Sequence, residues 1–212
     1  CTNPIFASQL PRETGDELCL LPRSVRSPEL VVFGVLGGVP RHLVAPEAAA
    51  PEATGDAFWT PIVGRDPERF DLSGIDPHMI ASVHPRPGLP SPSTTPGDNG
   101  TDPVHGREWF TNGEGLQYAC TYELLEPRDC ATELGDASSC ECVPGSTVHP
   151  PLCDAAGAQV RGKANPSLRP LRVARELGAR AVIGSVCPAS FAEGYRSFMQ
   201  RLVARIEPRL AK

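Results

Sequence analysis

Two histidines follow aspartates in the proline-rich middle of the chain, which places metal-binding groups close together. His78 stands two residues after Asp76, and His105 stands three residues after Asp102. Imidazoles and carboxylates are common ligands of divalent metals, so these four side chains could converge on one ion with His84. None of the five histidines has the spacing of a zinc-protease motif. Surface positions in solvated loops are therefore the favoured interpretation.

The segment 98–102 has the composition of a calcium loop. It reads Asp-Asn-Gly-Thr-Asp and offers carboxylate and hydroxyl oxygens around a glycine turn. It lacks the spacing and the bidentate glutamate of an EF-hand, and an ordinary turn explains the same residues. No cofactor is expected, and calcium is the ion to consider. The candidate metal ligands are Asp98, Asp102 and His105.

Ser185 is the only serine that invites a comparison with a nucleophile, because it stands at the end of an apolar run. The Gly-x-Ser-x-Gly elbow is absent around it, so a serine at a turn into a disulfide is the favoured interpretation. A hydrolase would have to draw on Ser185, His105 or Asp102. No catalytic residue is assigned. The glycines near residue 37 do not form a nucleotide-binding Gly-x-Gly-x-x-Gly.

Eight cysteines indicate an oxidised protein. Five of them lie between residues 120 and 153, in a loop-like stretch rich in proline and glycine. Cross-links of about 2–4 kcal/mol each stabilise such a stretch, and they persist in oxidising compartments. Zinc is disfavoured, because only Cys140 and Cys142 stand close together and no second pair completes four ligands. The cysteines predicted to form disulfides are Cys1, Cys19, Cys120, Cys130, Cys140, Cys142, Cys153 and Cys187.

The sequence favours one set of pairings without fixing it, since eight cysteines allow many arrangements. Cys1 and Cys19 flank a short, turn-rich segment, so a bridge between them is expected. Short bridges are also expected within residues 130–153. Cys120 and Cys187 would then join the loop region to a core strand.

Two continuous apolar runs, residues 30–39 and 181–186, predict strands that are buried on both faces. Such runs are typical of a parallel sheet. Residues 116–125 alternate in part and are rich in strand-forming side chains, so they predict a third strand.

Two longer helices flank the second run. Ser167 is the candidate N-cap of the first, and Gly178 supplies its left-handed stop. Ser190 and Glu193 form a capping box for the second helix. Its apolar residues recur every three to four positions, and it is expected to end before Pro208.

The middle of the chain has many prolines and little periodicity. Asp56 is the candidate cap of one short helix. Asp76 is the candidate cap of another, over residues 77–83, in which Pro77 takes the first helical position. The sequence of residues 85–100 predicts an exposed loop or a disordered one.

These elements predict an α/β fold with a small, partly parallel sheet flanked by helices and a long proline-rich, disulfide-bearing insertion. Parallel pairing of the two apolar runs would make a right-handed crossover. The chain is expected to form one domain over residues 1–212. Its core segments are 28–40, 116–125 and 166–207, and its insertion is 41–165, interrupted by the strand at 116–125.

The C-terminal segments 171–178, 182–187 and 191–206 form a helix, a strand ending in Ser-Val-Cys, and a long amphipathic helix. This order resembles the end of a von Willebrand factor type A domain, in which the same elements close a doubly wound sheet. Residues 30–39 are similar to the preceding core strand of that family. The tail is also similar to the C-terminal part of secreted proteins of high-GC bacteria that carry a cysteine-rich insert.

The resemblance implies an adhesion-type fold but no metal site. The family's site needs Asp-x-Ser-x-Ser at the end of the first strand. The nearest text here is residues 71–74, Asp-Leu-Ser-Gly, which lacks the second serine and follows no apolar strand. No adhesion residues are therefore carried over to this chain.

The charge and hydropathy patterns narrow the class of protein. The net charge of −5 is spread along the chain without a basic face, so nucleic acid is not an expected partner. No run of about 18 apolar residues exists, so no membrane span is expected. Secretion or export to the periplasm is expected. A lipid anchor at Cys1 is the alternative, although an apolar segment follows it where lipoproteins have a polar tether.

The leading hypothesis is a non-catalytic binding, adhesion or structural module with a protein or cell-surface partner. The module could be the C-terminal part of a larger protein. A secreted hydrolase and a subunit of a surface assembly are the alternatives.

Overall fold

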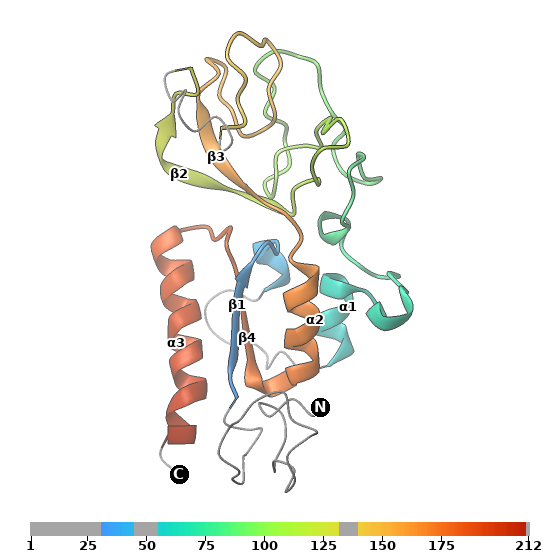
Figure 1. Cartoon of the computed structure of the whole chain (residues 1–212), viewed down its shortest axis with the longest axis vertical. Helices are drawn as coiled ribbons and strands as arrows, with labels where there is room; N and C mark the ends of the chain where they lie inside the picture. The colour runs from blue at the N-terminus through green and yellow to red at the C-terminus, as the bar shows by residue number, and fades with distance from the viewer. Residues whose placement is uncertain (1–30, 45–54, 132–139, 211–212) are drawn as a thin grey trace, which may run out of the picture.

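The computed structural model describes residues 31–44, 55–131 and 140–210, and the findings below concern these residues. The described chain has two parts (Figure 1). An α/β core forms the lower part of the view. A cap of loops around an antiparallel strand pair lies above it and comprises residues 81–131 and 140–164.

The core is built on two parallel strands, β1 at Phe33–Gly37 and β4 at Ala181–Ser185. They pair in register from Phe33 opposite Ala181 to Gly37 opposite Ser185. Every residue of β4 is buried, as expected of a continuous apolar strand in a parallel sheet. The two predicted strands and the α/β fold class with a small, partly parallel sheet are therefore confirmed. Burial on both faces was expected of β1 as well, and this is wrong, because only Gly37 of β1 is buried and Leu36 is 36% exposed.

Helices cover both faces of this strand pair. Helix α1, Asp56–Val63, and helix α2, Leu168–Leu177, lie on one side, and helix α3, Phe191–Leu210, lies on the other (Figure 1). The largest apolar cluster joins α1 and α2 to β4 through side chains that are almost fully buried, and Phe33 and Val35 of β1 pack against it. Its members include Trp59 and Ile62 of α1, Leu171 and Ala174 of α2, and Ile183 of β4.

Ser167 precedes α2 as predicted, but its side chain does not cap the helix. Its Oγ accepts a hydrogen bond of 2.9 Å from the backbone N–H of Gly38. A Cβ on Gly38 would lie only 1.9 Å from the carbonyl oxygen of Asn165, so only glycine fits this crossing. The serine thus fastens the end of β1 to the start of α2. Gly178 ends α2 with a positive φ of 54°, as predicted, but its ψ of −125° lies outside the left-handed helical region.

Helix α3 does not end before Pro208, which was the expectation, but continues to Leu210. A proline removes one backbone hydrogen bond, and a helix can bend at such a residue without ending there. On the buried face, Phe198 packs against Gly184 of β4, where a Cβ would lie 2.9 Å from the phenyl ring. Tyr195, expected on the same inner face, is 50% exposed.

The cap contains an antiparallel pair, β2 at Cys120–Arg128 and β3 at Gln159–Ala164. The register shifts between Glu123 and Arg128, which marks a bulge. The third strand was predicted at 116–125, so the observed strand begins and ends several residues later. Strand β3 was not predicted, because its sequence is polar and its pairing is with a distant segment.

Three disulfides are present among the described residues. Cys120 at the start of β2 is bonded to Cys187 after β4, which ties the cap to the core. Two local disulfides staple the loops of the cap, Cys130–Cys140 and Cys142–Cys153. All three agree with the expected arrangement. The predicted Cys1–Cys19 bridge lies outside the described residues.

Short 3₁₀ turns lie in the segments between the helices and strands. They are η2 at Arg41–Leu43, η3 at Pro67–Arg69, η4 at Pro77–Met79 and η6 at Gly178–Arg180. Asp76 caps η4 as predicted, since its carboxylate accepts a hydrogen bond from the N–H of His78. The turn ends at Met79, so the helix expected over 77–83 is wrong. Helix α1 forms as predicted, with Asp56 as its first residue rather than its cap.

Among the described residues, no helix has both the length and the apolar character needed to cross a bilayer.

Candidate functional site

Two adjoining cavities lie where the cap meets the carboxyl ends of β1 and β4, and they share Arg41, Pro188 and Ala189. In open α/β sheets this edge is the usual place for ligands. The first, here the basic cavity, has a volume of about 400 Å³. The second, here the hairpin cavity, has a volume of about 720 Å³. The basic cavity is lined by Arg41, His42, Ser185, Ser197 and Arg201, among others. The hairpin cavity includes Asp102, Thr121, Glu123 and Arg161.

Arg201 of α3 is the most unusual residue of the basic cavity. Its Nε is buried without a hydrogen-bond partner, and burial lowers the pKa of its guanidinium. Within the described part of the chain, no carboxylate pairs with it. A guanidinium keeps its charge, so this cavity holds an uncompensated positive charge beside a second arginine, Arg41.

Ser185 lies at the floor of the basic cavity but is not arranged as a nucleophile. Its hydroxyl donates a hydrogen bond to the carbonyl oxygen of Val39. The Ser185 Oγ in turn accepts a hydrogen bond of 3.0 Å from the N–H of Cys187. A serine nucleophile needs a base within hydrogen-bond reach, whereas this hydroxyl donates its proton to a backbone carbonyl oxygen. Ser185 therefore fastens the turn into the disulfide, as the favoured interpretation of the sequence held.

A chain of alternating histidines and aspartates runs from the basic cavity into the cap. His42 Nε2 lies 3.0 Å from Asp76 Oδ2. His78 bridges two carboxylates, with Nδ1 2.8 Å from Asp76 Oδ1 and Nε2 3.1 Å from Asp102 Oδ2. His78 sits on η4 and Asp102 in a loop of the cap, so the chain connects the two parts of the molecule.

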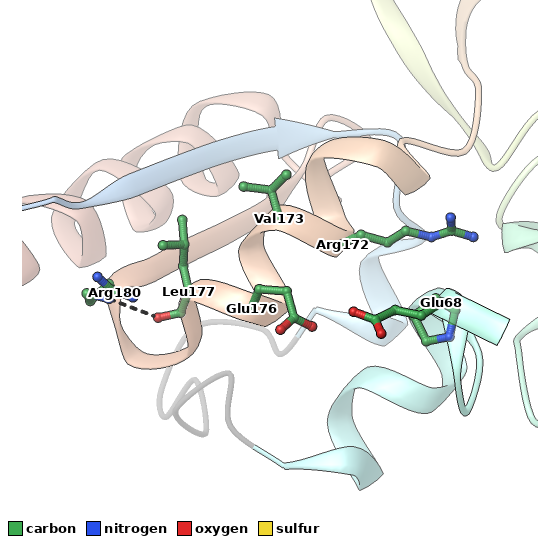
Figure 2. A pocket seen from close by; sticks show the side chains of 7 residues that line it. Glu68, Arg172, Val173, Glu176, Leu177 and Arg180 are labelled. Carbon is green, nitrogen blue, oxygen red and sulfur yellow. Dashed lines mark hydrogen bonds between the residues drawn. The ribbon is translucent and has the colours of Figure 1, made fainter. Parts of the chain in front are cut away.

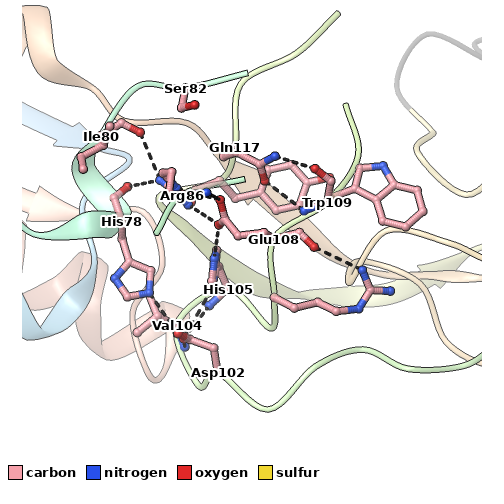
Figure 3. A network of polar contacts seen from close by, with 12 residues as sticks. His78, Ile80, Ser82, Arg86, Asp102, Val104, His105, Glu108, Trp109 and Gln117 are labelled. Atoms are coloured by element: carbon pink, nitrogen blue, oxygen red, sulfur yellow. Dashed lines mark hydrogen bonds and ion pairs between the residues drawn. The ribbon is translucent and has the colours of Figure 1, made fainter. Parts of the chain in front are cut away.

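His105, Glu108 and Arg86 continue this network in the interior of the cap (Figure 3). His105 Nε2 lies 2.7 Å from Glu108 Oε1. The same carboxylate receives two hydrogen bonds from the Arg86 side chain, of 3.0 and 2.8 Å. Arg86, His105 and Glu108 are all buried, which is unusual for ionisable residues and requires the pairing that is seen.

Hydrogen bonds within the network favour the charged forms of its histidine and carboxylate side chains. Burial lowers the pKa of His78, but the bonds to Asp76 and Asp102 outweigh burial, and the net pKa is raised. Burial raises the pKa values of both aspartates, but hydrogen bonding outweighs it, and their net pKa values are lowered. Glu108 behaves in the same way, and its bonds from His105 and Arg86 bring its pKa to about 2. An imidazolium between two carboxylates is the state these shifts favour.

The structure brings together four of the residues named from sequence: Asp76, His78, Asp102 and His105. His78, Asp102 and His105 offer ligand atoms that all lie within 4.8 Å of one another, as do those of His42, Asp76 and His78. His84 is exposed and belongs to neither group. The favoured interpretation of solvated loop histidines is thus wrong for His78 and His105, which are buried.

The segment around Asp98 forms an ordinary turn, which was the favoured interpretation of its sequence. Asp98 Oδ1 accepts a hydrogen bond from the N–H of Gly100, and its backbone oxygen accepts two from the Arg107 side chain. Asp98 is therefore part of a turn, and it belongs to neither of the two groups of metal-ligating atoms.

Sequence reasoning missed Arg86 and Glu108. Arg86 lies in the tract 85–100, which was expected to be an exposed loop, yet it is only 3% exposed. Neither residue lies in a segment whose apolar residues recur with the period of a helix or a strand, so the sequence gives no sign that they are buried. The weak signal available was the pairing of one arginine and one glutamate with histidine neighbours in a stretch otherwise rich in proline.

A third cavity lies away from this region, between α2 and η3 (Figure 2). Glu68 and Glu176 face each other across it, and Arg172 extends beside them. Charges of both signs line this groove, so it offers no single charge to attract a ligand.

Comparisons of this chain with protein-family models, with curated proteins and with solved structures find no match.

Proposed function

We propose that this chain is an extracytoplasmic, non-catalytic binding module that receives an acidic group of a protein or cell-surface partner in the basic cavity. The observation that carries this proposal is Arg201. Its guanidinium is partly buried, and its Nε has no hydrogen-bond partner. Burying an unpaired cation costs free energy, which an anionic ligand would recover.

The surroundings of Arg201 support the same function. Arg41 and His42 line the same cavity, and Ser197 supplies a hydroxyl. Most of the remaining lining is formed by small or apolar residues, such as Gly184 and Pro188, which suit a site with a few placed polar groups. Three disulfides favour an oxidising compartment outside the cytoplasm. The resemblance of the tail to von Willebrand factor type A domains also favours partner binding over catalysis.

Binding of small anions tests this function directly. Phosphate, sulfate and a short polyglutamate peptide are titrated into isotope-labelled protein, and the amide NMR signals of Gly184, Ser185 and Gly194 are followed. At least one probe is expected to shift these signals. Arg201→Gln should weaken that binding about tenfold or more, because a charge-assisted hydrogen bond is worth about 1.5–3 kcal/mol.

Arg196→Gln is the matched control, since Arg196 is an exposed arginine of the same helix outside the cavity. It should bind as the wild type does. Equal binding by Arg201→Gln, or no shift with any probe, would rule the proposal out.

A secreted hydrolase is the second candidate, and one observation favours it. Asp102 and His105 meet His78 beside the hairpin cavity, and metal-assisted hydrolases use such ligand sets. Chromogenic phosphate and carboxylic esters with added zinc would test this activity. Turnover that disappears in Asp102→Asn would support a hydrolase, and the absence of turnover in the wild type would leave the binding module.

A further inference from the structure

Three side chains from two separate segments present their ligand atoms to one point. His78 comes from η4, and Asp102 and His105 come from the cap loop. One ring nitrogen of each histidine and an oxygen of Asp102 lie within 4.8 Å of one another. The nitrogens that approach Asp102 are Nε2 of His78, at 3.1 Å, and Nδ1 of His105, at 3.6 Å. The two imidazole rings meet edge to face, with centroids 4.8 Å apart. Two imidazoles and one carboxylate form a ligand set typical of zinc.

The Nδ1 atom of His105 gives an independent reason to place a cation here. His105 is fully buried, and this nitrogen has no hydrogen-bond partner. Because Nε2 faces the Glu108 carboxylate at 2.7 Å, we assign the ring proton to Nε2. Nδ1 then presents a lone pair to Asp102 Oδ1 at 3.6 Å, which is too long for a hydrogen bond. Two acceptors facing each other in a buried site are repulsive unless a positive charge lies between them.

Both histidines are also oriented from behind by a carboxylate. Nδ1 of His78 lies 2.8 Å from Asp76, and Nε2 of His105 lies 2.7 Å from Glu108. Metal-binding histidines usually donate their second ring N–H to such a group, which fixes the tautomer and strengthens the ligand. Asp76 and Glu108 are held in turn by His42 and Arg86. The outer partners of a metal site are thus in place around these two rings, and Figure 3 shows Glu108 and Arg86 beside His105.

The geometry points to a site for one divalent transition-metal ion, with His78 Nε2, Asp102 and His105 Nδ1 as its protein ligands. Zinc is the ion that such ligands suit best, and two nitrogen ligands disfavour calcium. The ion takes the place of the proton between His78 and Asp102. Asp102 also lines the hairpin cavity, which leaves room for a water molecule as fourth ligand.

The neighbouring group His42, Asp76 and His78 is a weaker candidate. His42 is 45% exposed in its side chain, and both of its neighbours already satisfy each other at 2.8 Å. No buried nitrogen of this group lacks a partner. It therefore serves as the support of the site rather than as the site itself. This inference stands apart from the proposed anion binding, which uses Arg201.

Metal titration of the oxidised, chelator-stripped protein tests the site. Zn²⁺ is titrated by calorimetry and Co²⁺ by absorption spectroscopy, and one ion per chain is expected. The Co²⁺ spectrum should lack the charge-transfer band of thiolate ligands.

Three substitutions remove one ligand atom each and keep the rest of the network. His105→Gln retains a donor to Glu108 and loses Nδ1. His78→Asn retains a donor to Asp76 and loses Nε2, and Asp102→Asn removes the charge. Each should abolish the one-ion stoichiometry. Asp76→Asn should weaken binding about 10–100-fold, as expected of an outer partner. His84→Gln changes an exposed histidine outside the group and should bind as the wild type does.

Thermal unfolding without metal confirms that each variant folds. Added Zn²⁺ should raise the melting temperature of the wild type and of His84→Gln, raise that of Asp76→Asn less, and leave those of the three ligand variants unchanged. The proposal is overturned if the wild type binds no ion up to millimolar concentrations. It is equally overturned if a thiolate band appears, or if the three ligand variants bind as tightly as the wild type.

Discussion

Arg86 and Glu108 form an ion pair that is hidden from water on both sides. Their side chains are 1% and 0% exposed, and the guanidinium also donates to the carbonyl oxygens of His78, Ile80 and Tyr118. A buried pair of this kind adds little net stability compared with apolar residues, but losing one partner is costly. The pair therefore acts by fixing where three irregular segments of the chain cross.

Glu108→Gln should destabilise the protein by about 3–5 kcal/mol, because Arg86 would keep its charge in a buried position without a counterion. Urea unfolding followed by fluorescence measures the loss. The double variant Arg86→Met with Glu108→Gln removes the stranded charge and should recover part of it. A change below about 1 kcal/mol in the single variant would show that the pair is dispensable.

The same carboxylate predicts a loss of stability in acid. The pKa of Glu108 is about 2 in the folded protein, and its usual value of 4.5 applies to the unfolded chain. Its contribution is complete above pH 4.5 and disappears as the pH falls towards 2, with a total of about 3 kcal/mol. Unfolding free energies of wild type and Glu108→Gln between these pH values should converge. Parallel curves would contradict the prediction.

His78 predicts the opposite dependence in the metal-free protein. Its pKa is raised above 6.5 by Asp76 and Asp102, despite burial, so its contribution is complete below pH 6.5. Stability should fall as the pH rises through the folded pKa. The wild type should therefore lose more stability than His78→Asn across this alkaline range, as measured by chemical unfolding at fixed temperature.

Sequence alone could name the candidate residues but not their partners. Asp76, His78, Asp102 and His105 were recognisable from residue type. His42 lies 34 residues from Asp76, and Arg86 lies 22 from Glu108. Such pairs meet across irregular backbone, where no helical or strand period relates one position to another.

At the scale of elements, the parallel strands were predictable because a continuous apolar run has few alternatives to burial on both faces. Strand β3 was not, because Gln159 to Ala164 is polar and gains its conformation from pairing with β2. Helix α3 was predictable in position, but its C-terminal end was not, since the helix continues through Pro208 to Leu210.

The close packing of α3 on β4 predicts a cost for Gly184→Ala. The new Cβ would lie 2.9 Å from the Phe198 ring and 3.0 Å from the Leu36 side chain. Overpacking of this kind costs about 1–3 kcal/mol, so the melting temperature should drop. Gly115→Ala is the control, because a Cβ there meets nothing within 4 Å. Equal melting temperatures for both variants would contradict this packing.

At the scale of the molecule, the sheet of the core is small. The described residues give it one parallel pair, and the outer side of α3 exposes Met199 and Val203 at 37% and 45%. These features favour the hypothesis that the chain works as part of a larger protein or surface assembly.

The disulfides should differ in their contribution to stability. Cys120–Cys187 spans 67 residues and Cys130–Cys140 spans 10. Loop-closure entropy predicts losses of about 4.4 and about 2.7 kcal/mol when the two bonds are removed. Cysteine-to-serine pairs at each bridge, compared by urea unfolding, check this order. A larger loss for the shorter bridge would point to native-state effects instead.

The bond between Cys120 and Cys187 also decides how the molecule would respond to mechanical tension. It joins the first residue of β2 to the turn after β4, beside the basic cavity. A partner that pulled on the cap would strain a covalent link to the core, and the cap could not peel away by breaking side-chain contacts. In single-molecule stretching, the 67-residue loop closed by this bond would stay locked in the oxidised protein and would lengthen the chain only after reduction.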